Sequence, residues 1–220
     1  MNMFKKLVDF YLQQDEVEVL LRHCDVEEII FFVLGPNGTH INMAANEWAK
    51  KINVFNKSVF HFVETLEIAV LKAKEVVDVH RLPIFVTCAV YDKLNKLFFG
   101  NPDCYFFLHH HYMRLDNIQL SARKKVDIIP PEWIIASHPS PKFLVTHLPN
   151  RIIETSSNSK AAILCAEGKV DCCITNETSK NLYNLETIFH FGKPILPFYF
   201  STTLSGIKIL KKIKALQKKS

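Results

Sequence analysis

The chain has 220 residues, of which 48% are hydrophobic and 22% are charged, and its formal net charge is +5. This length and hydrophobic content allow a buried core in one domain or in two small lobes. The positive excess is modest, and the basic residues form no stripe with interleaved aromatic residues, so the composition gives no support to a nucleic-acid partner.

The first 23 residues do not read as a signal peptide, because acidic side chains such as Asp9 and Asp15 interrupt any apolar core. No apolar run reaches the ~20 residues that a membrane-spanning helix needs. We therefore expect a cytoplasmic protein with no membrane partner. The six cysteines form no C-x-x-C motif and are expected to be free thiols of a reducing compartment: Cys24, Cys88, Cys104, Cys165, Cys172 and Cys173.

The hydrophobic pattern of the first half predicts helices and strands in alternation. An amphipathic helix over 3–23 stands in front of the main domain, and its exposed face is a candidate surface for a homodimer. The continuous apolar run over 29–34 predicts a buried strand. The elements expected next are a helix over 41–51, a strand over 54–60, a helix over 62–74, and strands over 84–90, 105–112 and 118–123.

The second half repeats this alternation. Strands are predicted over 133–136, 152–154, 170–175 and 198–203, and helices over 157–167, 176–183 and 204–217, with Gly168 as a C-cap. The pattern predicts an α/β fold with mainly parallel sheets flanked by helices. No long linker is present, so we expect two lobes that share crossing strands near 103–108 and 184–192. The predicted division is a helical extension over 1–28, lobe 1 over 29–104 and 188–220, and lobe 2 over 105–187.

Three strand-to-helix turns carry the candidate chemistry: Leu34–Thr39, Ser137–Pro141 and Glu154–Asn158. Helix capping alone explains the serines and threonines of any one of them. Three such turns at the carboxyl ends of strands form a ligand crevice in α/β proteins, and helix N-termini favour anions. The sequence therefore predicts a site for a small acidic ligand.

Two other features have plainer explanations. His109, His110 and His111 suggest a metal, but alternate residues of a strand face opposite sides and no carboxylate or cysteine stands beside them at ligand spacing. We expect a half-buried strand there, with no metal and no cofactor. The basic amphipathic segment Ile207–Lys214 is expected to be a solvated last helix, with a membrane-surface helix as the alternative.

Taken together, the turns resemble the prephenate dehydratase-like family. That family has a Leu-Gly-Pro-x-Gly-Thr turn, matched by Leu34–Thr39, and a Ser-His-Pro motif, matched by Ser137–Pro139. Its Ser/Thr pair before an Ala-Ala helix is matched by Thr155–Ser157 and the alanines that follow. The resemblance covers about residues 29–203 and implies a two-lobed type-2 periplasmic-binding-like fold with the ligand between the lobes.

Within that family, the segment Ser137–Pro141 and the segment Ile174–Glu177 are similar to prephenate decarboxylases of the bacilysin-pathway type, as are Tyr91 and Asp92. Dehydratases carry a Thr-Arg-Phe motif on the last strand, and this chain has Pro-Phe-Tyr-Phe-Ser-Thr there without an arginine. The resemblance implies loss of CO2 from prephenate without aromatisation, giving a dihydro-hydroxyphenylpyruvate for antibiotic-type secondary metabolism.

The resemblance also implies roles for individual residues. One carboxylate would be held by Gly38, Thr39, Thr155, Ser156 and Ser157, and the other by Ser137, His138 and Ser140. Tyr91, Asp92 and Asn176 would orient the ring hydroxyl, Phe198 would keep water out, and His138 and His40 are the candidate proton donors. Two alternatives stay open: a dehydratase that makes phenylpyruvate, and a non-catalytic module of the same fold that binds a small acid.

Overall fold

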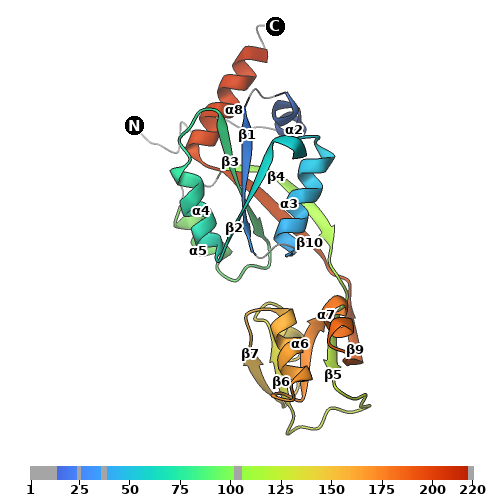
Figure 1. The fold of residues 1–220 in the computed structure, drawn as a ribbon. Helices are drawn as coiled ribbons and strands as arrows, with labels where there is room; N and C mark the ends of the chain where they lie inside the picture. The colour runs from blue at the N-terminus through green and yellow to red at the C-terminus, as the bar shows by residue number, and fades with distance from the viewer. Residues whose placement is uncertain (1–13, 24–25, 36–38, 102–105, 218–220) are drawn as a thin grey trace. The chain divides into compact units, whose positions relative to one another are not determined.

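The computed structural model describes residues 14–23, 26–35, 39–101 and 106–217, and it is an α/β protein as the sequence predicts (Figure 1). The chain divides into two compact units, unit 1 (residues 1–113 and 197–220) and unit 2 (residues 114–196). The borders predicted from the sequence, 104/105 and 187/188, each lie nine residues earlier. Both connections run through strands, so the hydrophobic pattern gives no signal at the point where the units divide.

Unit 1 is built around a five-stranded mixed sheet in the order β2-β1-β3-β10-β4. The strands are β1 (Glu28–Leu34), β2 (Ser58–Val63), β3 (Arg81–Cys88), β4 (Phe106–Arg114) and β10 (Ile195–Thr202). β1 runs parallel to β2 and β3, and β10 runs antiparallel to β3. The central residues of β1 are all buried because helices cover both faces of the sheet.

The helices of unit 1 are α2 (Gln14–Arg22), α3 (His40–Lys51), α4 (Leu66–Glu75), α5 (Leu94–Phe99) and α8 (Leu204–Gln217), with a short 3-10 turn, η1 (Phe55–Lys57). α3 and α4 lie on opposite faces of the sheet (Figure 1). The helix predicted over 62–74 begins only at Leu66, because Phe62 and Val63 extend β2 alongside β1 and Thr65 caps the helix. The expected helix over 3–23 lies outside the described residues up to residue 13.

An aromatic cluster forms the core of unit 1 between the sheet and α3. The Trp48 ring contacts Phe200 at 4.3 Å and stacks on His109 at 4.9 Å between centroids. Phe31 stacks on Phe60 at 5.2 Å. His109, one of the three consecutive histidines, is thus a buried core residue of β4. His111 is on the surface of the same strand and pairs with Glu47 at 3.0 Å. The described residues include no group of three side chains placed to hold a metal ion.

Unit 2 has a second five-stranded mixed sheet, in the order β7-β6-β8-β5-β9. The strands are β5 (Ile118–Ala122), β6 (Ile134–Ser137), β7 (Arg151–Glu154), β8 (Cys172–Asn176) and β9 (Glu186–Gly192). β6 runs parallel to β7 and β8, whereas β5 runs antiparallel to β8 and β9. The helices are α6 (Asn158–Ala166) and α7 (Glu177–Leu182), with a 3-10 turn, η2 (Pro141–Leu144).

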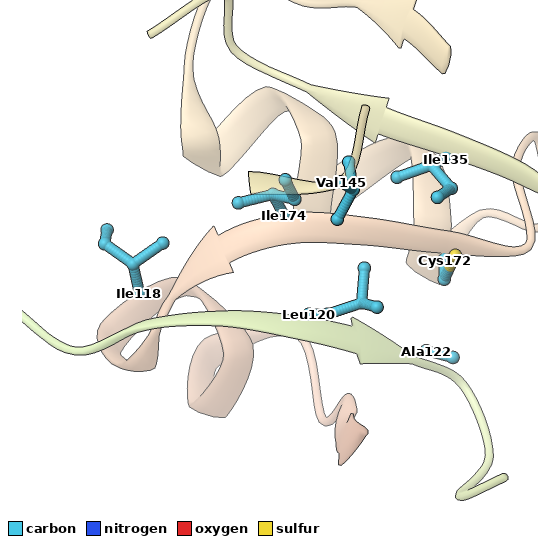
Figure 2. Close-up of a cluster of buried hydrophobic side chains, with 7 residues drawn as sticks. All are labelled: Ile118, Leu120, Ala122, Ile135, Val145, Cys172 and Ile174. Atoms are coloured by element: carbon cyan, nitrogen blue, oxygen red, sulfur yellow. The ribbon is translucent and has the colours of Figure 1, made fainter. Parts of the chain in front are cut away.

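Each face of this second sheet has its own core. Figure 2 shows the cluster in which Ile118, Leu120 and Ala122 of β5 lie with four residues of other segments: Ile135, Val145, Cys172 and Ile174. The other face packs on α6 through Ala136, Ala161, Ala162, Cys165 and Cys173. The chain leaves α6 through Gly168, whose φ of +73° favours glycine.

The cysteines that the structure describes are free, buried thiols: Cys88, Cys165, Cys172 and Cys173. Cys24 and Cys104 lie outside the described residues. Among the described helices, none has an apolar stretch long enough to span a bilayer.

Candidate functional site

Three parallel strand ends of unit 2 meet at one edge of its sheet. β7, β6 and β8 are neighbours, with Ser137 paired with Glu154 and Ala136 paired with Cys173. Parallel strands place their carboxyl ends together, so the segments that follow Ser137, Glu154 and Asn176 lie at the same edge. This polar edge, as we call it, contains Ser137–Ser140, Thr155–Ser159 and Asn176–Ser179.

Ser137 and Thr155 are joined across the polar edge. The Thr155 N–H donates to the Ser137 carbonyl at 2.9 Å. The Ser137 hydroxyl is fully buried and donates to the His138 carbonyl at 2.8 Å. The His138 ring is half-buried, and its Nδ1 accepts the Ser140 N–H at 3.2 Å. The predicted residues of the second turn are therefore ordered by one another, and of these Ser140 is the exposed one.

The start of α6 forms the middle of the polar edge. Ser157 is its N-cap, with an extended backbone and a hydroxyl that accepts the Lys160 N–H at 3.0 Å. The Thr155 hydroxyl donates to the Ser157 carbonyl at 3.0 Å, and Ser156 is exposed. The first-turn N–H groups of a helix have no intrahelical partner and carry partial positive charge. This turn can therefore offer N–H donors to an anion.

Asn176 caps the neighbouring helix α7, where its Oδ1 accepts the Ser179 N–H at 3.0 Å. The two helix starts are connected, because the hydroxyls of Ser159 and Ser179 lie 2.8 Å apart. Thr175 adds a second link by donating to the Asn158 carbonyl at 3.0 Å. The structure thus brings together every predicted site residue of unit 2 along one edge of one sheet.

Sequence reasoning assigned no role to three side chains of this unit that carry a buried polar atom, Gln119, Ser121 and Asn158, although Asn158 belongs to the third predicted turn. Asn158 Oδ1 and Gln119 Nε2 are buried and have no hydrogen-bond partner within the described part of the chain. Gln119 is 1% exposed and pairs in register with Thr175, and its Oε1 accepts the Thr187 hydroxyl at 2.8 Å. The alternation of apolar and polar residues along β5 could have indicated that Gln119 is buried. Gln119 stands between Ile118 and Leu120, which face the other core, so it must point to the opposite face of the sheet.

The predicted turn of unit 1 is only partly described. Gly38 lies outside the described residues. Thr39 is the N-cap of α3, where its hydroxyl accepts the Asn42 N–H at 3.3 Å and donates to the Leu34 carbonyl at 2.6 Å. His40 is the first residue of that helix and is half-buried. A cavity of about 620 Å³ adjoins Gly35 and is lined also by Phe62, Ile68 and Lys72.

Tyr91 and Asp92 line a different cavity of unit 1, with a volume of about 570 Å³. The Tyr91 hydroxyl donates to the Glu67 carboxylate at 2.8 Å. Burial and this bond both raise the pKa of Tyr91 above its ordinary value, so the phenol keeps its proton. Asp92 is exposed. Tyr91 and Asp92 therefore lie beside aromatic side chains, in a cavity that differs from the one beside Gly35.

Phe198 is 1% exposed and lies in the sheet core, opposite Cys88 of β3. Its ring fills the core in the described conformation, and its expected role in keeping water from a ligand stays a prediction. Tyr199, the next residue, is the one that reaches the 570 Å³ cavity.

Solved structures show which fold this is. The periplasmic VFT2 domain of BvgS from Bordetella pertussis is 12% identical, with a TM-score of 0.52 over 94% of this chain and 93% of that chain. PhnD1 from Prochlorococcus marinus, solved with methylphosphonate, is 10% identical, with a TM-score of 0.52 over 86% and 82%. The fold is periplasmic-binding-like. Identities this low show the fold alone, and the expectation of fold class is confirmed.

The prephenate dehydratase of Staphylococcus aureus is also similar, at 15% identity and a TM-score of 0.41. The match covers 78% of this chain and only 66% of the dehydratase, and a likeness of that size supports no argument about activity. No protein-family model matches the chain, and no curated protein matches its sequence. The periplasmic-binding-like fold therefore fits the family resemblance, and the motifs remain its basis.

Proposed function

We propose that the chain binds a small dicarboxylic acid of the prephenate class at the polar edge of unit 2. The observation that supports this most is the connected start of α6 and α7, where hydroxyls from both helix starts lie beside the first N–H groups of α6. The first N–H groups of α7 already donate to Asn117, Asp116 and Asn176, so the proposal assigns the carboxylate to α6. Ser156 and Ser157 with the N–H groups of α6 would hold one carboxylate, and Ser137, His138 and Ser140 the other. Asn176 would hold the ring hydroxyl.

Asp92 and Tyr91 are not part of this proposed acid site. An exposed carboxylate such as Asp92 repels a dicarboxylate, and Tyr91 is already bonded to Glu67. The Thr39 turn keeps its sequence-based role as a candidate anion site of unit 1, with His40 beside it.

The proposed reaction is decarboxylation without aromatisation. The bond between the ring carbon and its carboxylate breaks, CO2 leaves, and the electron pair moves through the ring to a carbon that takes up a proton. The ring hydroxyl stays in place. A dehydratase must instead protonate that hydroxyl, and β10, which reads Ile-Leu-Pro-Phe-Tyr-Phe-Ser-Thr, lacks the arginine of the dehydratase motif. His138 is the candidate donor because it lies at the polar edge and histidine titrates near neutral pH.

A binding module without catalysis is the second candidate. The neighbours of highest structural similarity named above are the periplasmic VFT2 domain of BvgS and PhnD1, which was solved with methylphosphonate, an anion. The polar edge supports this alternative as well, because hydroxyls and N–H groups suffice for binding. Catalysis needs in addition a proton donor placed beside the ring.

Incubation with prephenate separates these functions. A decarboxylase releases CO2 and leaves a hydroxylated, non-aromatic product, which mass spectrometry and proton NMR identify. Phenylpyruvate as the direct product would refute the proposed reaction in favour of the dehydratase. Saturable binding in calorimetry without CO2 release over hours would favour the binding module, and absence of binding would refute both.

Two variants of one residue test the acid site. Asparagine and aspartate both cap helices well, so Ser157→Asn and Ser157→Asp each keep α6 in place. They are nearly the same size and differ in charge. We expect Ser157→Asn to bind prephenate much as the wild type does and Ser157→Asp to bind at least about tenfold more weakly, because like charges are then juxtaposed. Equal affinities of the two variants would place the acid elsewhere.

A further inference from the structure

The 570 Å³ cavity of unit 1 is walled by aromatic rings. Tyr91, Phe98, Phe99, Phe107 and Tyr199 line it, and Asp92 is its charged lining residue among those described. Phe98 and Phe99 meet edge to face at 5.5 Å, and Phe107 and Tyr199 do so at 5.8 Å. The two rings of each pair are steeply inclined to each other. The cavity is therefore bordered by aromatic faces that point in several directions.

The positive charges of α5 lie away from this cavity. Leu94, Asn95, Phe98 and Phe99 line it, and on a helical wheel they fall within an arc of about 140°. Lys96 lies about 160° from Phe98 on the same wheel. Lys93, the neighbour of Asp92, is not among the described lining residues. The helix thus turns its aromatic arc toward the cavity and Lys96 away from it.

Negative charge lies at the wall formed by Tyr91 and Asp92. The Asp92 carboxylate is exposed. The Tyr91 hydroxyl donates to Glu67 at 2.8 Å, which places a second carboxylate beside that hydroxyl, within the field of Lys93. Aromatic faces carry negative electrostatic potential, and a nearby carboxylate adds to their attraction for a cation. An anion meets repulsion at the same wall.

We propose that this cavity binds a small organic cation, an alkyl or quaternary ammonium whose charge lies against the aromatic faces and Asp92. The volume of about 570 Å³ accommodates a small molecule. This ligand class is separate from the acid of the proposed function, and the cavity shares no residue with the polar edge.

Choline and its neutral isostere 3,3-dimethylbutan-1-ol are the probes, titrated by calorimetry against the full chain. We expect saturable binding of choline and binding of the alcohol that is weaker by about threefold to thirtyfold, the range of a cation–π contribution. Phe99→Leu keeps an apolar side chain but removes a π face, and Asp92→Asn removes the charge. Each should weaken choline binding severalfold and leave the weak binding of the alcohol nearly unchanged.

Phe143→Leu is the matched control, because Phe143 is 74% exposed and Phe99 79%, and Phe143 belongs to unit 2. It should bind choline as the wild type does. Equal affinity for choline and the alcohol would overturn the proposal, and so would unchanged choline binding by Phe99→Leu. Self-association that Phe99→Leu abolishes, with no choline binding, would assign the rings to a contact between copies instead. Binding and turnover of prephenate by Phe99→Leu should equal those of the wild type, so each proposal can fail without the other.

Discussion

Replacing His109 with phenylalanine should remove a pH-dependent loss of stability from unit 1. The His109 side chain is 6% exposed and stacks on Trp48, and its Nδ1 lies 3.7 Å from Glu18. Burial lowers the pKa of His109 from 6.5 to about 4, since the core disfavours the charged ring. Glu18 opposes this fall, while Lys51 and the flanking His110 and His111 add to it.

The direction of the effect follows from proton binding. The pKa of His109 is lower in the folded chain than in the unfolded chain, so the unfolded chain binds more protons as the pH falls below 6.5. Stability therefore declines from pH 6.5 down to about 4 and is unaffected by this group above 6.5. A fall of the pKa from 6.5 to about 4 corresponds to about 3 kcal/mol of unfolding free energy, taken at its full extent.

Urea unfolding at a series of pH values measures this decline. With Trp133→Phe as the background, the fluorescence of Trp48 reports unit 1. The difference in unfolding free energy between the parent and His109→Phe should change by about 3 kcal/mol between pH 7 and pH 4, with phenylalanine keeping the ring on Trp48. His147→Gln, at an exposed position of unit 2, should follow the parent curve. Parallel curves for the parent and His109→Phe would refute the reasoning.

Three further results are expected. Gly206→Ala should destabilise unit 1 by about 1–3 kcal/mol in urea unfolding, because the new methyl group would overlap the Thr202 hydroxyl. Leu120→Ala should cost unit 2 about 2–5 kcal/mol by opening a cavity in the cluster of Figure 2, whereas Leu182→Ala, at a residue 69% exposed, should change stability by about 0.5 kcal/mol or less. Glu18→Gln should lower the pKa of His109 further in an NMR titration, since the only opposing charge is then gone from its described surroundings.

The elements predicted well are those whose burial produces a clear hydrophobic pattern in the sequence. β1 is covered on both faces, so it appears as the uninterrupted run Ile29–Val33, and α3 follows a threonine cap. α5 escaped prediction, whereas the strand expected near 184–192 is present as β9, at the edge of the sheet of unit 2. α5 is six residues long, too short for a periodic pattern, and the residues of β9 are half-buried or exposed.

The turns of the candidate site could be predicted because helix capping is visible in the sequence. The capping Ser or Thr stands three residues before the residue whose N–H its hydroxyl accepts. Ser157 and Lys160 are such a pair. The bonds that join separate turns leave no such signal: Ser159 meets Ser179 only because α6 and α7 start side by side. Gln119 likewise depends on register, since a shift of one residue along β5 would turn it to the other core.

The hydrogen bonds of the polar edge also bear on how an acid would bind there. The hydroxyls of Ser137 and Thr155 donate to carbonyls at 2.8 and 3.0 Å, and Ser157 accepts from Lys160. A ligand that recruited the two donating hydroxyls would break these two bonds, at a cost comparable to the new bonds. Affinity would then come mainly from the exposed Ser156 hydroxyl and from the N–H groups at the start of α6 that precede Lys160, since those of Lys160 and Ala161 already donate to Ser157. This predicts that Ser156→Ala weakens acid binding more than Thr155→Val does in calorimetry, and the reverse order would assign the recognition to the buried hydroxyls.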